Sequence, residues 1–134
     1  MIGDTDFFVD LMRLRSAYHA RAVAKARELE SRGIRIAMTA VTRFELSSGI
    51  EGSVEPARER ERVLRAIGSF PAYPLDGPSG DRAGGIHGER RARGSGIGPA
   101  DAMIAGIALE NREPLLTRNL ADFALIEGLV LDTY

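Results

Sequence analysis

The sequence contains no cysteine and no tryptophan, and histidine occurs only twice. The absence of cysteine excludes a disulfide, a thiolate nucleophile and a sulfur-ligated metal, and two histidines cannot build a three-histidine zinc centre. No uncharged run exceeds ten residues, whereas a membrane helix needs about 20, and no basic, apolar leader opens the chain. We therefore expect a cytoplasmic protein without a membrane segment, in which carboxylate and hard-metal chemistry remain open.

Lysine is nearly absent as well, because Lys25 is the only one and the other 17 cationic side chains are arginine. The formal net charge of −1 argues against a strongly basic nucleic-acid binder. Arginine suits bidentate contacts with phosphate, but a GC-rich coding sequence would produce the same preference for arginine. The bias alone therefore does not decide between these two explanations.

The residues that are present are those of an ordinary globular domain. With 134 residues, of which 44% are apolar and 28% charged, the chain is long enough to bury one core and is neither disordered nor fibrous in composition. We therefore expect a single domain over residues 1–134.

Short apolar stretches alternate with segments of helical periodicity. Strands are predicted at residues 1–4, 34–38, 72–75, 114–117 and 129–131. Helices are predicted at residues 7–14, 17–31, 40–48, 57–68, 100–111 and 120–123, with a weak helix and a mobile loop within residues 77–98. Ser16 and Thr39 are the predicted N-caps of the second and third helices, and Gly49 is predicted to end the third. The strand patterns are apolar rather than alternating, which predicts an α/β domain with a parallel sheet covered on both faces.

Acidic side chains occur where such a sheet would place a ligand site, beyond the carboxyl ends of its strands. Asp4 ends the first predicted strand, and we expect it to be functional rather than only the N-cap of the next helix. For Asp6 the capping role is the preferred interpretation. Asp122 and Asn119 follow the strand at residues 114–117 in the same way.

Glu45 lies on a helical stripe with Val41 and Ser48, beside Phe44, which places a carboxylate on or next to the buried face. A surface glutamate paired with Arg43 or with a neighbouring helix explains the pattern equally well. The sequence leaves both interpretations open.

Asp101 shares the apolar stripe of its helix with Ile104, Ala105 and Ala108. An ordinary cap is the alternative, although Pro99 suggests that the helix begins before this residue. The small residues of this helix allow a close approach to the sheet.

Four separated carboxylates could thus converge on one edge, where a divalent cation would neutralise their repulsion. With oxygen ligands only, Mg²⁺ or Mn²⁺ is the expected ion.

Four sequence blocks together resemble the ordered signature of PIN domains, and most closely the VapC group of toxin ribonucleases. The blocks are Asp4-Thr5-Asp6, Thr42-x-x-Glu45-Leu46 followed by Gly49, Ile97-Gly98-Pro99-x-Asp101-x-x-Ile104-Ala105, and Thr117-Arg118-Asn119-x-x-Asp122-Phe123. The resemblance spans nearly the whole chain. It departs from the family pattern at Gly3, where an apolar residue is usual, and at Asp6, where asparagine is usual.

The resemblance implies a three-layer α/β/α fold around a central parallel sheet of four to five short strands. It also implies a Mg²⁺- or Mn²⁺-dependent endoribonuclease that cleaves RNA with a metal-activated water, is a homodimer and is controlled by a small antitoxin protein. The residues assigned in this way to metal binding and catalysis are Asp4, Glu45, Asp101 and Asp122, and the supporting residues are Asp6, Thr117 and Asn119. An acidic site needs a basic rim to hold a polyanion, and the candidates for phosphate contacts are Arg82, Arg90, Arg91, Arg93 and Arg118.

Other functional classes fit the sequence less well. The glycine-rich segment at residues 94–98 follows no strand and lacks the Gly-Lys-Ser/Thr ending of a phosphate-binding loop. A phospho-acceptor receiver domain needs a lysine after a late strand, and no Gly-x-Ser-x-Gly supports a hydrolase triad with His19 or His87. The remaining alternative is a non-catalytic PIN-like domain that binds RNA or protein, against which the intact set of acids argues.

Overall fold

The computed structural model describes residues 1–134, which form five short strands and seven helices. The strands are β1 (Ile2–Gly3), β2 (Met38–Thr39), β3 (Ala72–Tyr73), β4 (Leu115–Leu116) and β5 (Leu131–Asp132). The helices are α1 (Thr5–Met12), α2 (His19–Ser31), α3 (Ala40–Glu51), α4 (Pro56–Ile67), α5 (Gly77–Ala92), α6 (Pro99–Glu110) and α7 (Leu120–Phe123).

All the strand pairings are parallel. Strand β4 lies between β1 and β5, and β2 pairs separately with β3. A parallel bridge between Ile2 and Ala37, the residue before β2, joins the two groups of strands. The order across the sheet is therefore β3-β2-β1-β4-β5, which confirms the prediction of a parallel sheet of four to five short strands.

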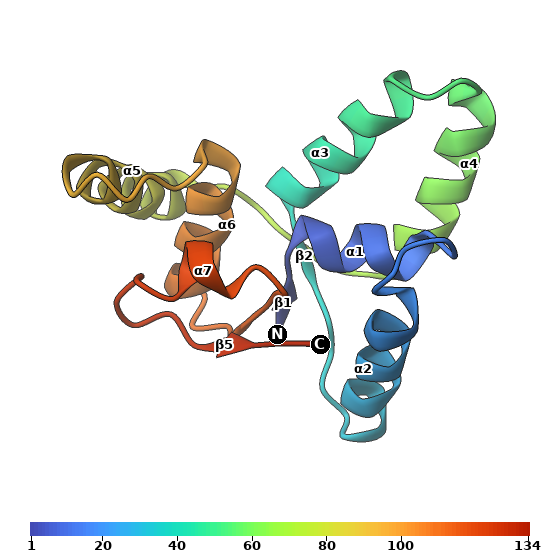
Figure 1. Ribbon diagram of the computed structural model, residues 1–134, viewed down its shortest axis with the longest axis horizontal. Helices are drawn as coiled ribbons and strands as arrows, with labels where there is room; N and C mark the ends of the chain where they lie inside the picture. Colours follow the sequence, from blue (N-terminus) through green and yellow to red (C-terminus); the bar gives the residue numbers. More distant parts are fainter.

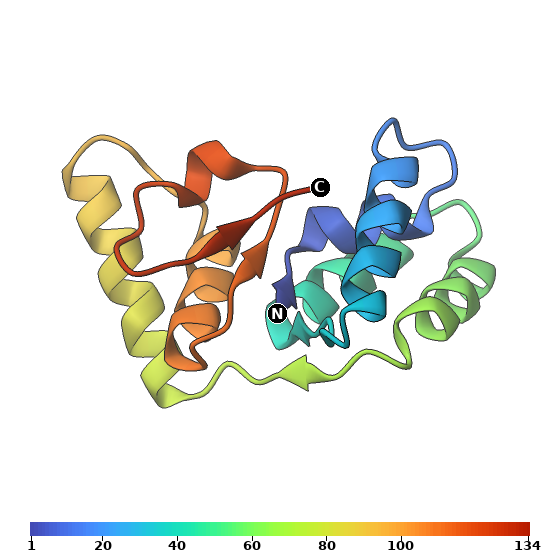
Figure 2. The ribbon, with the colours of Figure 1, turned by 90° about the horizontal axis from the view of Figure 1, so that it is seen from below.

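Helices cover both faces of the sheet, as Figures 1 and 2 show, with α5, α6 and α7 on one side and α1 to α4 on the other. Successive strand residues point to opposite faces, so Leu115 packs into one core with Ile2 and Ile104, whereas Leu116 packs into the other. The second core contains Phe7 and Phe8 of α1. This alternation of apolar side chains confirms the three-layer α/β/α arrangement.

The starts of three helices follow from capping side chains. The Asp4 carboxylate accepts a hydrogen bond from the backbone N–H of Phe7, so this residue, and not Asp6, is the N-cap of α1. Thr39 caps α3 as predicted, through the N–H of Thr42. Asp76 caps α5 through the N–H of Ser79.

Three predicted features of the helices differ from the structure. Helix α2 begins at His19, because the Ser16 hydroxyl donates to Asp10 and accepts from the N–H of Tyr18, which forms a turn and not a helix start at residue 17. Helix α3 continues through Gly49 to Glu51, so Gly49 does not end it. Helix α5 is a regular helix of 16 residues, not a weak one, although it contains five glycines. Packing against α6 compensates for the low helix propensity of those glycines.

Two glycines allow close approach between elements. A Cβ atom at Gly3 would lie 2.8 Å from Cδ1 of Phe7, so the departure from the family pattern at this position makes room for the aromatic rings of α1. A Cβ atom at Gly106 would lie 2.6 Å from the backbone oxygen of Ser79. This glycine of α6 therefore brings the helix close to α5, whereas Ala102, Ala105 and Ala108 of the same helix pack in one core with Ile2 and Leu115 of the sheet, as predicted.

None of the helices has both the length and the apolar composition needed to cross a lipid bilayer.

Candidate active site

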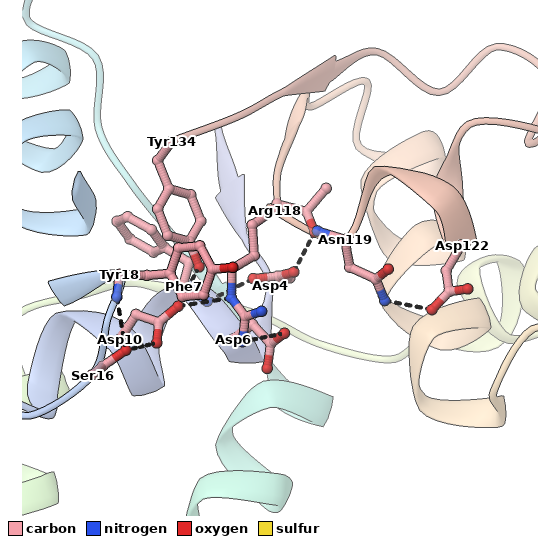
Figure 3. A network of polar contacts seen from close by, with 11 residues as sticks. Asp4, Asp6, Phe7, Asp10, Ser16, Tyr18, Arg118, Asn119, Asp122 and Tyr134 are labelled. Atoms are coloured by element: carbon pink, nitrogen blue, oxygen red, sulfur yellow. Dashed lines mark hydrogen bonds and ion pairs between the residues drawn. The ribbon is translucent and has the colours of Figure 1, made fainter.

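The four acids predicted to form the site lie around the carboxyl ends of the strands. Asp4 directly follows β1, Glu45 lies in the second turn of α3, Asp101 in the first turn of α6 and Asp122 in α7. Parallel strands end at a common edge of the sheet, which brings these four elements together. Figure 3 shows Asp4 and Asp122 beside the turn that follows β4.

Asp4 is 4% exposed, and both of its carboxylate oxygens accept hydrogen bonds. The Thr117 hydroxyl donates to Oδ2 at 2.5 Å and the N–H of Phe7 donates to Oδ1 at 2.7 Å. Burial raises the pKa of Asp4 to about 6 despite these two bonds, which lower it, and the negative charges of Asp6 and Asp101 raise it further. Asp4 is therefore both the cap of α1 and an acid that resists ionisation.

Asp101 is half-buried and has no hydrogen-bond or ion-pair partner in the protein. Burial raises its pKa to about 6, and the charges of Asp122, Glu45 and Asp6 add to this effect in that order. The N-cap of α6 is Gly98, which makes no side-chain cap, so Asp101 does not have the capping role that was its alternative interpretation. Asp122, Glu45 and Asp6 therefore lie close enough to Asp101 for their charges to oppose its ionisation.

Glu45 and Asp122 are held by neighbouring polar side chains. The Thr5 hydroxyl donates to Oε2 of Glu45 at 2.5 Å, and the side-chain amide of Asn119 donates to the carboxylate of Asp122. Asn119 also donates its backbone N–H to the Thr117 hydroxyl oxygen at 2.9 Å. The turn after β4 thus contacts two of the four acids, through Thr117 and Asn119.

Of the residues predicted to lie on the same buried stripe of α3 as Glu45, or beside it, only one is buried. Val41 is buried, but Phe44 is 70% exposed and Ser48 is exposed. The stripe proposed from the sequence is therefore wrong at these two positions, because the buried face of α3 is formed by Val41, Thr42, Leu46 and Ile50. The far end of the helix extends away from the sheet (Figure 1). Glu45 lies near the start of α3, where the helix is still close to β2.

The atoms of the four acids that could bind a metal are all carboxylate oxygens. No arginine, lysine or histidine pairs with any of these acids. No three of the carboxylates lie close enough together to hold one metal ion between them alone. Mg²⁺ retains several waters and is usually held by one or two carboxylates. The unpartnered Asp101 and the oxygen donors around it therefore fit a hydrated divalent cation of this type.

Arg118 belongs to a second group of polar side chains, which lies beside Asp4 (Figure 3). Its guanidinium pairs with Asp6 at 3.0 Å and with Asp10 at 2.8 Å, and lies 4.5 Å from the centre of the Tyr18 ring. Arg118 is a candidate for a phosphate contact from the sequence, but in this structure its charge is matched by two carboxylates of α1.

Asp10 is buried, and it accepts hydrogen bonds from three side chains. The Ser16 hydroxyl donates at 2.5 Å, Arg118 at 2.8 Å and the Tyr134 hydroxyl at 2.9 Å. Burial raises the pKa of Asp10, but these hydrogen bonds outweigh it and hold the pKa below its ordinary value. Asp10 is therefore a charged anchor that joins α1 to the two segments after β4 and β5.

The other candidate arginines all belong to α5 or to the residue after it. Arg82 pairs with Glu110 at 2.9 Å, and Arg93 lies 3.8 Å from Glu89. Arg90 is 6% exposed and donates from Nε to the backbone oxygen of Ser95. Arg91 is exposed.

Three residues that contact the site or its support were not identified from the sequence as part of it. They are Thr5, Asp10 and Tyr134. The spacing of Asp6 and Asp10, four residues apart on one helix, is a signal that both could share one cation. No local pattern points to Tyr134, which lies 124 residues from its partner.

Comparisons with known proteins show the family to which the chain belongs. A family model described as the PIN domain matches residues 1–128. A protein named tRNA(fMet)-specific endonuclease VapC from Salmonella typhimurium is 30% identical over 100 residues, which cover 75% of this chain and 76% of that protein. A protein of the same name from Shigella flexneri is 28% identical over 95 residues, covering 71% of this chain and 72% of that protein.

Solved structures of similar fold cover nearly the whole chain. VapBC2 from Rickettsia felis, bound to a DNA fragment from its promoter, superposes with a TM-score of 0.86 at 19% identity, over 99% of this chain and 97% of that one. DNA-bound VapBC from Salmonella typhimurium superposes with a TM-score of 0.83 at 25% identity, over 98% and 96%. These likenesses confirm the fold that the sequence predicts.

Proposed function

Because the chain belongs to the PIN domain family, we propose that it is a Mg²⁺- or Mn²⁺-dependent endoribonuclease and the toxin of a toxin–antitoxin pair. The observation that carries this proposal is Asp101, a half-buried acid without a protein partner that lies among three other carboxylates. If Asp101 had no function, the protein would be more stable without this carboxylate, because burial and the neighbouring acids oppose its ionisation.

In this proposal Asp4, Glu45, Asp101 and Asp122 hold the cation, either directly or through water. When bound, a divalent cation supplies Lewis-acid activation of a water and charge stabilisation at the leaving oxygen of a phosphodiester. The protein positions its own groups: Thr117 orients Asp4, Thr5 orients Glu45, and Asn119 orients Asp122. Asp101 remains free to bind.

The first test is the metal requirement of RNA cleavage. We expect the purified protein to cleave RNA in Mg²⁺ or Mn²⁺, to stop in EDTA and to recover when excess Mn²⁺ is added, because the carboxylates repel substrate phosphates without a cation. Electrophoresis of RNA fragments gives the cleavage, and calorimetric titration with Mn²⁺ gives the metal binding. A folded protein that neither cleaves RNA nor binds Mn²⁺ would instead be the non-catalytic binding domain of the alternative interpretation.

The second expectation concerns a protein partner. A cognate antitoxin should place an arginine against the carboxylate cluster, where several charge-assisted hydrogen bonds would hold it. Co-expression of the affinity-tagged chain with the reading frame directly upstream of its gene should therefore recover a small second protein. Substitution of Asp101 by asparagine should reduce the recovery, and repeated isolation of the tagged chain alone would contradict the toxin assignment.

A further inference from the structure

A cavity of about 730 Å³ lies between the end of α1, the turn that follows it, and α4. Asp6, Asp10 and Arg118 form one of its walls, and these are the residues that Figure 3 shows beside Asp4. The charge of Asp6 acts on both Asp4 and Asp101. None of the four acids lines the cavity, but Asp6 in its lining is two residues from Asp4, so the cavity begins beside the candidate active site. Its volume lies within the range of known ligand sites.

Positive charge exceeds negative charge in the lining of this cavity. It contains four guanidinium groups, from Arg13, Arg15, Arg62 and Arg118, and two carboxylates, from Asp6 and Asp10. Arg118 already pairs with both carboxylates.

The other three arginines differ in how far their charge is matched. Arg62 pairs with Glu59 of its own helix. Arg13 contributes to the lowered pKa of Glu59, after the larger effect of Arg62, but has no carboxylate within ion-pair distance. Arg15 is exposed and also has no ion-pair partner. The positive charge that remains available in the cavity is therefore that of Arg13 and Arg15.

The cavity beside α5, where the sequence places most of the phosphate-binding candidates, has the opposite balance. It measures about 550 Å³ and is lined by three arginines and four acids. The arginines are Arg82, Arg90 and Arg93, and the acids are Asp81, Glu89, Glu110 and Glu127. A polyanion is repelled by such a lining, so the α5 cavity is the weaker candidate for a phosphate site.

We propose that Arg13 and Arg15 bind backbone phosphates of the RNA substrate in the cavity at the end of α1, an inference that rests on the proposed ribonuclease function. Arginine is suited to this ligand because its planar fork binds phosphate with two parallel hydrogen bonds. An acidic cleavage site cannot attract RNA by itself, so the phosphates next to the scissile one need nearby cations. The cavity supplies them on the α1 side of the acids.

The test compares two double variants of equal net charge. Arg13→Gln with Arg15→Gln removes the two guanidiniums of the cavity, while Arg27→Gln with Arg35→Gln removes two unpaired arginines elsewhere. The probe is a fluorescein-labelled single-stranded RNA of mixed sequence, about 20 nucleotides long so that it spans the site. Its binding is measured by fluorescence anisotropy in EDTA, over a range of salt concentrations, and thermal unfolding checks that both variants fold.

We expect the cavity variant to bind this RNA about tenfold more weakly than the wild type, because two charge-assisted hydrogen-bonding groups are removed. The slope of log affinity against log salt should decrease by about 0.7 for each phosphate that is no longer neutralised. The control variant should lie close to the wild type in both quantities. In Mn²⁺, the cavity variant should show a raised KM with little change in kcat, because the two arginines stabilise bound substrate and transition state alike.

The outcomes separate this inference from the proposed function. If the wild type cleaves RNA and the cavity variant binds and cleaves like the control, the phosphate site is wrong and the ribonuclease function stands. If the wild type cleaves nothing but the cavity variant still loses RNA affinity in EDTA, the function is wrong and the RNA site stands. A parallel titration with an oligoglutamate peptide tests an acidic protein segment as the occupant. Loss of peptide binding with unchanged RNA binding would overturn the proposal.

Discussion

Replacing Asp101 by asparagine is expected to slow metal-dependent RNA cleavage by at least about a hundredfold. The substitution keeps the size of the side chain but removes the one carboxylate of the cluster that no protein group holds. A bound divalent cation contributes several kcal/mol to phosphodiester cleavage, and each 1.36 kcal/mol corresponds to about a factor of ten in rate. Rates are measured with saturating Mn²⁺ on the same RNA for both proteins.

Asp81→Asn is the matched control, because Asp81 is an exposed acid of α5 without an ion-pair partner. It should cleave at the wild-type rate. Mn²⁺ titration of both variants should show weaker binding only for Asp101→Asn. A folded Asp101→Asn protein that cleaves RNA at the wild-type rate would show that the acids at this edge of the sheet are not the active site.

The acids that converge in the structure could be predicted because their positions follow from regular elements. Asp4 and Asp122 come shortly after strands, and parallel strands end at one edge. Asp101 could be predicted because it interrupts an apolar helical stripe, which the structure confirms by packing Ile104 and Ala105 into the core. These are local patterns, with periods of two or of 3.6 residues, and they can be recognised in one sequence.

The hydrogen bonds that support the acids could not be predicted in this way, because they join residues far apart in the chain. The Thr5 hydroxyl reaches Glu45 across 40 residues, and the Arg118 guanidinium reaches Asp10 across 108. Such pairs depend on how the elements pack and not on any repeat. The length of α5 also depends on packing between elements. Its glycines alone favour a loop, but Gly106 allows α6 to pack closely against α5 and so stabilises the helix.

The same packing decides which arginines carry unmatched charge. The sequence suggests the arginines of residues 82–93 because they cluster there, yet acids of α5, α6 and the segment after α7 surround them in the structure. Arg13 and Arg15 belong to no motif, and they become candidates only because the chain turns there beside the acid cluster. Charge balance within a cavity is a property of the fold, which a count along the sequence does not give.

Asp101→Asn is also expected to make the metal-free protein more stable at neutral pH, by about 1–2 kcal/mol in the free energy of unfolding. Burial and the neighbouring acids raise the pKa of Asp101 in the folded protein to about 6, whereas in the unfolded chain it is about 3.9. The folded state therefore binds this proton more tightly, so the free energy of unfolding falls as pH rises from about 4 and is lowest above about 6. Two pKa units would correspond to about 2.7 kcal/mol, which partial exposure of the side chain reduces.

Added Mn²⁺ should reverse the order of the two proteins. A ligand that binds only the folded state stabilises it more as its affinity rises, and the wild type should bind Mn²⁺ more tightly than the variant. Thermal unfolding of both proteins, in EDTA and in Mn²⁺, at pH values on either side of 6 and at constant ionic strength, measures both effects. At a pH near 4 the difference in EDTA should vanish, because Asp101 is then protonated in the folded state. The opposite result is a metal-free Asp101→Asn protein that is less stable than the wild type at neutral pH. It would mean that the attraction between the Asp101 carboxylate and the positive end of the α6 dipole exceeds the repulsion from the neighbouring acids. Asp101 would then be a structural residue.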